Sequence, residues 1–155
     1  MAVPPDISRT HMELELEELQ ALAAAYQWKV SAELDQLRVT IEFNSAVDGE
    51  VFVVEFLCDD YKAKPPLIEF IEPKSKLRGT KKAYPKGGNG YFHEDKICVC
   101  AAFSRRGYAV LNGPHSDWDM TNWMNLSPRH TTIGLIMSAF QKVVNDPKHY
   151  KGRMA

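Results

Sequence analysis

The sequence predicts a single α/β domain over residues 1–155, in which one helix precedes an antiparallel sheet in the sequence and another follows it. Three observations predict this fold class: apolar residues at helical spacing over 12–26, alternating apolar and polar residues over 37–43, and a second helical stripe after Thr132. A chain of 155 residues is long enough to bury one hydrophobic core, and no internal repeat or linker divides it.

The first helix is predicted to begin at Thr10, because Thr10 and Glu13 have the spacing of a capping box. It runs to about residue 26. Its apolar stripe consists of Met12, Leu16, Leu19, Ala23 and Tyr26. Glu13, Glu17 and Glu18 lie mostly elsewhere on the helix, so we expect an acidic face that meets solvent and is available to a partner protein.

Three segments are predicted to form the sheet. Residues 37–43 alternate strictly, which indicates a strand with one face toward solvent. Residues 51–57 follow a turn at Gly49 and are apolar on both faces apart from Glu55, as expected for a central strand covered on both sides. Pro65 and Pro66 then interrupt regular pairing, and residues 67–71 form a short strand.

The stretch 72–130 is rich in Lys, Gly, Asn, Asp and Pro, so we expect mostly loops around one short apolar segment, 97–103. Loops of this length inside a compact domain are usually functional. A last helix is predicted to follow Thr131 and Thr132 and to end at Pro147. Its apolar face consists of Ile133, Ile136, Met137, Phe140, Val143 and Val144.

Composition restricts the class of partner. The formal net charge is −1 and 25% of the residues are charged, so bulk electrostatics predict binding neither to nucleic acid nor to a membrane surface. Another protein or a small molecule is the expected partner. Three cysteines do not form a secreted disulfide framework, and no signal peptide or apolar run of about 18 residues is present, so we expect a cytoplasmic protein.

Three motifs resemble those of the ubiquitin-conjugating enzymes. Residues 60–70, Asp-Tyr-Lys-Ala-Lys-Pro-Pro-Leu-Ile-Glu-Phe, are similar to the family's Asp-Tyr, three residues, Pro-Pro and a strand ending in Phe. Ile97-Cys98-Val99 is similar to the family's Ile-Cys-Leu around its thioester cysteine, and Trp123 with Pro128 is similar to its Trp-Ser-Pro. The resemblance spans residues 13–147. It implies a ubiquitin-conjugating-type fold with an N-terminal helix, an antiparallel meander, a long active-site loop and a C-terminal helix.

The resemblance also implies an activity. An activating enzyme would pass the C-terminal carboxyl of a carrier protein to the Cys98 thiolate, and an amine of a protein target would then attack the thioester. Neither step requires a cofactor or a metal, so we expect none. In the family an Asn of a His-Pro-Asn motif stands eight residues before the cysteine, where this chain has Gly90, and Asn89 is one residue out of register.

These departures from the family pattern suggest a divergent, bacterial-type relative. For such relatives the carrier is a ubiquitin-like protein or the C-terminal tail of a nucleotidyltransferase, and the setting is phage defence or protein tagging. The same departures leave the residue that stabilises the oxyanion unassigned.

Two cysteines compete for the role of nucleophile. Cys98 is favoured by the resemblance and by its position in a region rich in Gly, His and Lys, since a reactive thiol must be partly exposed and its thiolate supported. The alternative is an inert cysteine buried in a strand. Cys100 is the backup, because in an extended segment both thiols face the same side. Cys58 ends an apolar strand and is expected in the core.

The remaining candidate residues lie in loops. His93 is within reach of Cys98 if the chain turns, and could position the acceptor, act as a base or stabilise an oxyanion, or only be exposed. Asn89 could donate its amide to an oxyanion, or belong to a glycine-rich turn. Asp117 and Asp119 could orient or deprotonate an incoming amine, or cap a helix or lie in a solvated turn, and the role of His115 is equally open.

Three other functions remain open. Cys98 with His93 or His115 could form the dyad of a cysteine hydrolase. Cys98, Cys100, His93 and His115 could bind zinc, although one residue between the cysteines is fewer than structural zinc sites normally have, so no metal is expected. A catalytically silent relative that only binds carrier proteins is the third possibility, which the absent His-Pro-Asn favours.

Overall fold

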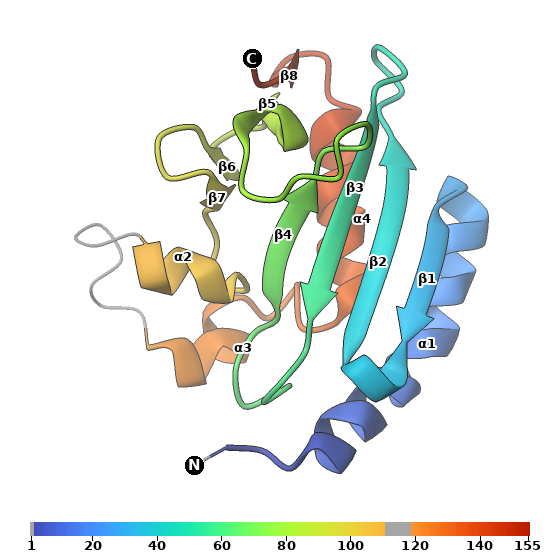
Figure 1. Ribbon diagram of the computed structural model, residues 1–155, viewed down its shortest axis with the longest axis vertical. Coiled ribbons are helices and arrows are strands. Elements are labelled where there is room, and N and C mark those ends of the chain that lie inside the picture. Colours follow the sequence, from blue (N-terminus) through green and yellow to red (C-terminus); the bar gives the residue numbers. More distant parts are fainter. Residues whose placement is uncertain (1, 111–118) are drawn as a thin grey trace.

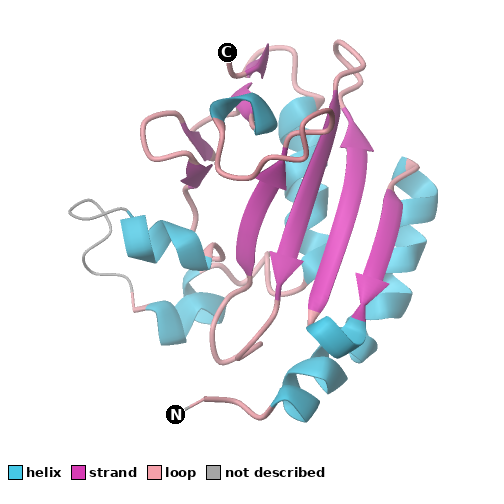
Figure 2. Ribbon diagram, viewed as in Figure 1, coloured by secondary structure: helices cyan, strands magenta, loops and turns pink. Residues whose placement is uncertain are grey.

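A four-stranded antiparallel sheet, with the strand order β1-β2-β3-β4, forms the middle of the fold (Figure 1). The structure, a computed structural model, describes residues 2–110 and 119–155. Helices α1 and α4 pack on the same side of the sheet, and the described parts of the irregular chain between β4 and α4 lie beside β4 (Figures 1 and 2). This arrangement confirms the predicted fold class and its order of N-terminal helix, meander and C-terminal helix.

The helices have the following bounds: α1 Pro5–Tyr26, η1 Leu34–Gln36, η2 Lys81–Ala83, α2 Arg105–Val110, η3 Met120–Asn122, α3 Trp123–Leu126 and α4 Ile133–Val144. The strands of the main sheet are β1 Lys29–Glu33, β2 Arg38–Asn44, β3 Val51–Leu57 and β4 Leu67–Ile71. Two further pairs are formed by β5 Pro85–Gly87 with β8 Tyr150–Arg153, and by β6 Phe92–His93 with β7 Cys98–Val99. Within the described residues, no helix is long and apolar enough to cross a membrane.

Helix α1 begins earlier than its sequence predicts. A proline at the first helical position lacks the N–H that would be unpaired there, so Pro5 starts the helix after Pro4. Thr10 does not act as a cap, because its hydroxyl donates to the Asp6 carbonyl inside the helix (2.9 Å). The predicted start at Thr10 was therefore wrong.

The two faces of α1 follow the prediction in part. Met12 and Leu19 are buried, whereas Tyr26 is exposed and stacks on Trp28 (ring centroids 5.2 Å apart). The predicted acidic face, Glu13, Glu17 and Glu18, is exposed. Glu18 also accepts a hydrogen bond from the Thr132 hydroxyl (2.5 Å), which ties this face to the start of α4.

The sheet contains the three predicted strands and one that was not predicted. In β2 buried and half-buried residues alternate, and its buried Ile41 pairs with Val54 of β3, which in turn pairs with Phe70 of β4. β1 was missed because four of its five side chains are exposed, so it shows no apolar alternation. The faces of β2, β3 and β4 toward α1 and α4 form the core with Met12, Leu19, Ile136, Met137 and Phe140.

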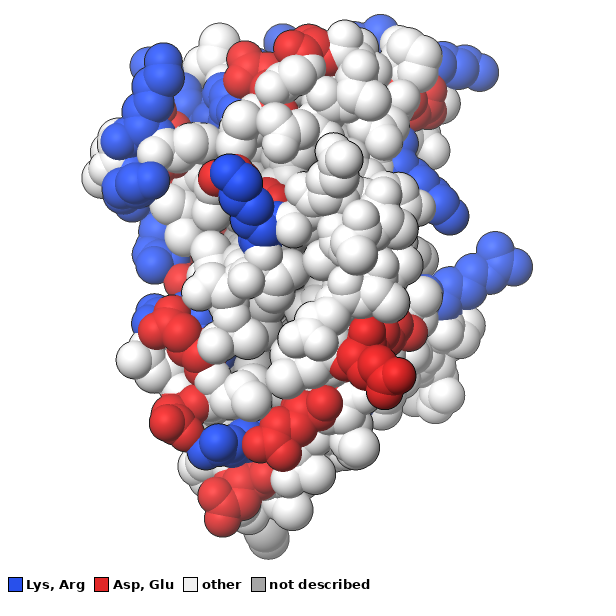
Figure 3. Space-filling model, turned by 90° about the vertical axis from the view of Figure 1, so that its right-hand side faces the viewer, with Lys and Arg blue, Asp and Glu red and all other residues white. Residues whose placement is uncertain are grey.

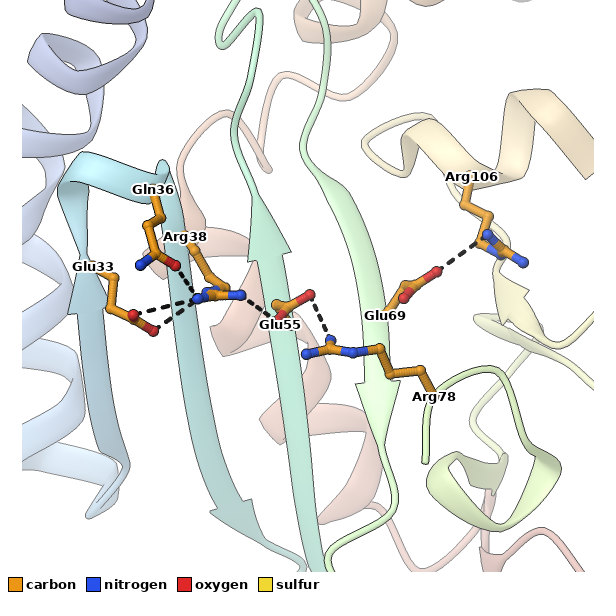
Figure 4. Close-up of polar contacts among 7 residues, drawn as sticks. All are labelled: Glu33, Gln36, Arg38, Glu55, Glu69, Arg78 and Arg106. Atoms are coloured by element: carbon orange, nitrogen blue, oxygen red, sulfur yellow. Dashed lines mark hydrogen bonds and ion pairs between the residues drawn. The ribbon is translucent and has the colours of Figure 1, made fainter. Parts of the chain in front are cut away.

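The opposite face of β3 is not fully covered, contrary to the prediction for residues 51–57. Val51, Val53 and Leu57 are half-buried there, and only Glu55 is buried. Its carboxylate lies between Arg38 (3.8 Å) and Arg78 (2.7 Å). Figure 4 shows this row of charged side chains, which runs across the sheet from Glu33 and Arg38 through Glu55 and Arg78, with Glu69 and Arg106 beyond. The buried carboxylate of Glu55 is thus covered and neutralised by two arginine side chains, and not by an apolar layer.

Helix α4 confirms the predicted second helix and is anchored by α1. The Thr132 hydroxyl accepts from the Leu135 N–H (3.1 Å) as an N-cap, and the helix ends at Val144, before Pro147. The buried carboxylate of Glu15 accepts the Ile133 N–H (2.8 Å) and the Tyr61 hydroxyl (2.9 Å). Glu15 thereby joins α1, the β3–β4 loop and the start of α4.

Candidate active site

The β6–β7 hairpin carries the candidate nucleophile. Phe92 pairs with Val99, and His93 pairs with Cys98. The Cys100 N–H also donates to the Tyr91 carbonyl (2.7 Å), which continues the pairing by one step. Since alternate residues of a strand face opposite sides, Phe92 and Val99 enter the core, and His93, Cys98 and Cys100 share the other face.

The turn of this hairpin fixes the His93 ring. The Ile97 N–H donates to the His93 carbonyl (2.9 Å), and Ile97 has a left-handed φ of 50°. The Lys96 N–H donates to His93 Nδ1 (3.1 Å). Because Nδ1 accepts, the neutral ring carries its proton on Nε2, which leaves that N–H to act as a donor.

Cys98 is shielded from solvent, unlike the partly exposed nucleophile that the sequence suggests. Its relative accessibility is 0%, whereas Cys100 is half-buried. Burial raises the pKa of the Cys98 thiol, the neighbouring Cys100 raises it further, and the positive charge of Arg106 lowers it. Burial also raises the pKa of the Cys100 thiol. Cys58 is fully buried, as expected, and burial is the main cause of the raised pKa of its thiol.

Helix α2 brings Arg106 to the site. Arg105 fixes the helix start, since its guanidinium donates to the Asp59 carboxylate (2.8 Å) and the Pro65 carbonyl (2.9 Å). Arg106 donates to Glu69 of β4 (3.1 Å; Figure 4). Gly107 packs against the strand, because a Cβ there would lie 3.2 Å from the Val99 carbonyl oxygen. A side chain at this position would make a tight contact that α2 or β7 would have to shift by a few tenths of an ångström to relieve.

Sequence reasoning missed Arg106. A helix of six residues is too short to show an apolar period, and α2 falls in the stretch expected to be loop. The available signal was the pair Arg105-Arg106 shortly after the candidate cysteine, since an arginine near a thiol lowers its pKa.

Asn89 lies in a left-handed turn with Gly88 and Gly90, with a φ of 56°. It lines a hollow of about 200 Å³ together with Tyr91, Lys142 and His149. Within the described residues, its side chain makes no hydrogen bond, to His93 or to any other group. The geometry therefore supports a role for Asn89 in the glycine-rich turn, and among the described residues it shows no contact that would support a role as an oxyanion donor.

The two acceptor-side candidates, His115 and Asp117, lie outside the described residues. Asp119, the next described acidic residue, caps η3: its carboxylate accepts from the Thr121 N–H (3.0 Å) and hydroxyl (2.8 Å). These hydrogen bonds lower the pKa of Asp119. Among the residues that the structure describes, no three His, Cys, Asp or Glu side chains are grouped so as to hold a metal ion.

The motif residues on both sides of the candidate cysteine meet in the structure. Trp123 is fully buried, and its indole N–H donates to the Lys62 carbonyl (2.9 Å). Its ring stacks on Tyr61 (centroids 6.3 Å apart). The segments 60–70 and 123–128 therefore pack together at the same end of the fold.

The comparisons with known proteins bear on the fold. No protein-family model and no curated protein matches the sequence. The solved structure of the ubiquitin-conjugating enzyme E2 UbcA1 from Agrocybe aegerita is similar to this chain, with a TM-score of 0.54 and 14% sequence identity. The match covers 94% of this chain and 86% of that one. This likeness shows that the chain has a ubiquitin-conjugating-type fold.

Proposed function

We propose that the chain is a ubiquitin-conjugating-like transferase that accepts the C-terminal carboxyl of a carrier protein on Cys98 as a thioester and passes it to a target amine. The observation that carries the proposal is the position of Cys98 opposite His93, in a hairpin next to the sheet of a ubiquitin-conjugating-type fold. The motif Ile97-Cys98-Val99 supports the same assignment.

The chemistry divides into two exchanges. In the first, the Cys98 thiolate attacks the carboxyl carbon of the carrier, and the thiolate of the activating enzyme leaves. In the second, a target amine attacks the thioester, Cys98 leaves as a thiolate, and the amine loses a proton. The positive charge of Arg106 stabilises the Cys98 thiolate both as the nucleophile of the first exchange and as the leaving group of the second. The Nε2–H of His93 is suited to the oxyanion of each tetrahedral intermediate.

The burial of Cys98 adds a condition to this mechanism. A thiol with no accessible surface must become exposed before a carrier carboxyl can reach it. Helix α2 packs directly on the strand that holds Cys98, and we propose that a shift of α2 away from β7 exposes the thiol for loading. Cys100, which is more exposed, is the backup nucleophile.

The partners follow from the proposed reaction. They are an activating enzyme, a carrier that is either a ubiquitin-like protein or the C-terminal tail of a nucleotidyltransferase, and a protein target. The absence of the family's His-Pro-Asn before Cys98 supports a divergent, bacterial-type relative acting in the cytoplasm in phage defence or protein tagging. No cofactor is needed, because the activating enzyme consumes the ATP.

Intact-mass analysis after incubation with an activating enzyme, a candidate carrier and ATP tests the proposal. We expect an adduct that thiols and hydroxylamine cleave. Cys98→Ser should abolish it or convert it to a thiol-resistant ester, whereas Cys100→Ser should leave loading largely intact. If Cys100→Ser alone abolishes the adduct, the nucleophile lies two residues further on.

A catalytically silent carrier-binding protein is the second candidate, and the burial of Cys98 favours it. A thiol that is shielded and has a raised pKa is a poor nucleophile. In this case the carrier would bind the wild type and both serine variants equally well, and no labile adduct would form.

A further inference from the structure

Two basic segments that are far apart in the sequence lie side by side at one end of the sheet. β5 pairs with β8, with Pro85 opposite Arg153 and Gly87 opposite Tyr150. An Arg153 N–H also donates to the Lys82 carbonyl (2.8 Å). Residues 72–86 and 148–153 thus form one surface, called the basic end below, at the top of Figure 1.

The basic end holds a large share of the positive charge. It contains nine of the chain's 19 Lys and Arg residues but a single acidic residue, Glu72. The rest of the chain carries the other 10 basic residues against 19 acidic ones. The net charge of −1 is therefore the sum of a positively charged basic end and a negatively charged remainder of the chain. Seen from the side of α1, most of the acidic side chains lie in the lower half of the molecule (Figure 3).

The lysines of this surface form no ion pair with a described carboxylate, although the charge of Lys148 acts on Asp146. The seven are exposed, and none forms an ion pair with a described residue: Lys74, Lys76, Lys81, Lys82, Lys86, Lys148 and Lys151. The two arginines are already engaged, Arg78 by Glu55 (2.7 Å) and Arg153 by Glu50 (3.2 Å). Gathering like charges costs free energy, so an external anion would stabilise this arrangement.

The shape and composition of the surface select the kind of anion. A hollow of about 470 Å³ opens between the β2–β3 turn and residues 72–74, and Lys74, Lys82 and Arg153 line it. Leu77 lies between Lys76 and Arg78 in the sequence and is 57% exposed. The two tyrosines of the basic end, Tyr84 and Tyr150, are buried, so neither phenol ring is available for stacking on nucleic-acid bases.

We propose that the basic end binds an acidic segment of a partner protein, one that presents an apolar side chain among its carboxylates. The carboxylates would pair with the free lysines, and the apolar side chain would cover Leu77. A protein segment fits better than a phosphate backbone, because a phosphate backbone has no apolar group to cover the exposed Leu77. This inference does not depend on thioester chemistry.

Fluorescence anisotropy with defined probes tests this proposal on the full chain. The probes are a labelled peptide with leucine between runs of glutamate, the same peptide with glycine in place of leucine, and single-stranded and duplex DNA of equal charge. We expect the leucine peptide to bind most tightly. Lys74→Glu with Lys82→Glu should raise its Kd about tenfold or more, and Leu77→Ser should remove the preference for leucine.

The control reverses two exposed lysines elsewhere, Lys29→Glu with Lys142→Glu, and so changes the net charge equally. We expect less than a twofold change in Kd from it. The proposal fails if this control weakens binding as much as the reversal at the basic end, because net charge alone would then explain binding. It also fails if DNA binds more tightly than the peptide, or if no probe binds the wild type.

Discussion

His93 and Cys98 are direct cross-strand partners in the β6–β7 hairpin. Side chains opposite one another in an antiparallel pair share a face, so the imidazole lies on the same side of the hairpin as the thiol. The sequence expectation required the chain to turn between His93 and Cys98, and residues 94–97 make that turn.

The first prediction concerns the chemistry of His93. His93→Ala should slow both loading of Cys98 and discharge to an amine by about 100-fold, if the ring stabilises the oxyanion. Single-turnover discharge of the preformed adduct measures this effect. His93→Asp keeps a side-chain acceptor for the Lys96 N–H but has no N–H to donate to an oxyanion. If Asp restores the rate fully, His93 only holds the turn, and the proposed oxyanion role is wrong.

How far the sequence predicts the fold depends on burial. β2 and α4 each present one buried face, and their periods are visible in Val39, Ile41 and Phe43 and in Ile133, Ile136 and Phe140. β1 and α2 are too exposed or too short to show a period. β8 is held by pairing with β5, a contact between residues far apart in the sequence, so local propensity carries no sign of it.

The sequence predicted which residues belong to the candidate site, but it did not predict their burial or the charged groups around them. The motif around Cys98 and the nearness of His93 follow from the linear order of residues. The burial of Cys98 and the approach of Arg106 depend on how α2 packs against β7, which no local pattern records. Glu15 illustrates the same limit, because a charged residue inside an apolar stripe gives no hint of its partners Tyr61 and Ile133.

The second prediction concerns the order in which the thiols react with iodoacetamide. Cys100 should react first because it is half-buried, Cys98 should follow slowly, and Cys58 should react only on unfolding. Each rate should increase about tenfold per pH unit until the pKa of its thiol is reached, which for all three lies above the usual value. Peptide mapping after timed labelling gives the order. Labelling of Cys98 before Cys100 would show that Cys98 is more accessible than its burial indicates.

The third prediction isolates the charge of Arg106. Since Arg106 lowers the pKa of Cys98, Arg106→Ala should raise that pKa further, and the pH profile of Cys98 alkylation should move to higher pH. Arg106→Lys retains the positive charge and should leave the profile close to that of the wild type. Arg129→Ala removes an exposed arginine from another loop and serves as the control. Equal shifts in all three variants would exclude a local effect of Arg106.

The fourth prediction concerns stability. Glu15→Ala leaves the Ile133 N–H, the Tyr61 hydroxyl and the Lys62 ammonium group (3.1 Å from Glu15) without their buried acceptor. We expect the free energy of unfolding to fall by about 3–5 kcal/mol in urea titrations. Glu17→Ala, on the exposed side of the same helix, should change it by less than about 0.5 kcal/mol. A loss at Glu15 no larger than at Glu17 would mean that this junction does not hold α1 and α4 together.

The fifth prediction concerns the pH dependence of stability through His130. The ring packs on Phe103 (centroids 5.1 Å apart), and its Nδ1 lies 2.8 Å from the Ser127 hydroxyl oxygen. Burial lowers the pKa of His130 below its usual value of 6.5, and the charges of Arg129 and Lys142 lower it further. The unfolded chain therefore binds a proton at His130 more readily than the folded chain does.

The sign of the effect follows from this difference. Above the unfolded pKa, His130 is neutral in both states and carries no penalty. As the pH falls through 6.5 toward the lowered folded pKa, the unfolded state takes up the proton first, so the folded state loses stability. Urea titrations at several values between pH 7.5 and 5.5 should show the wild type losing more stability than His130→Gln, which does not titrate. An equal loss in both proteins would place the pH-sensitive group elsewhere, and a smaller loss in the wild type would mean that the folded protein binds the His130 proton more tightly than the unfolded chain.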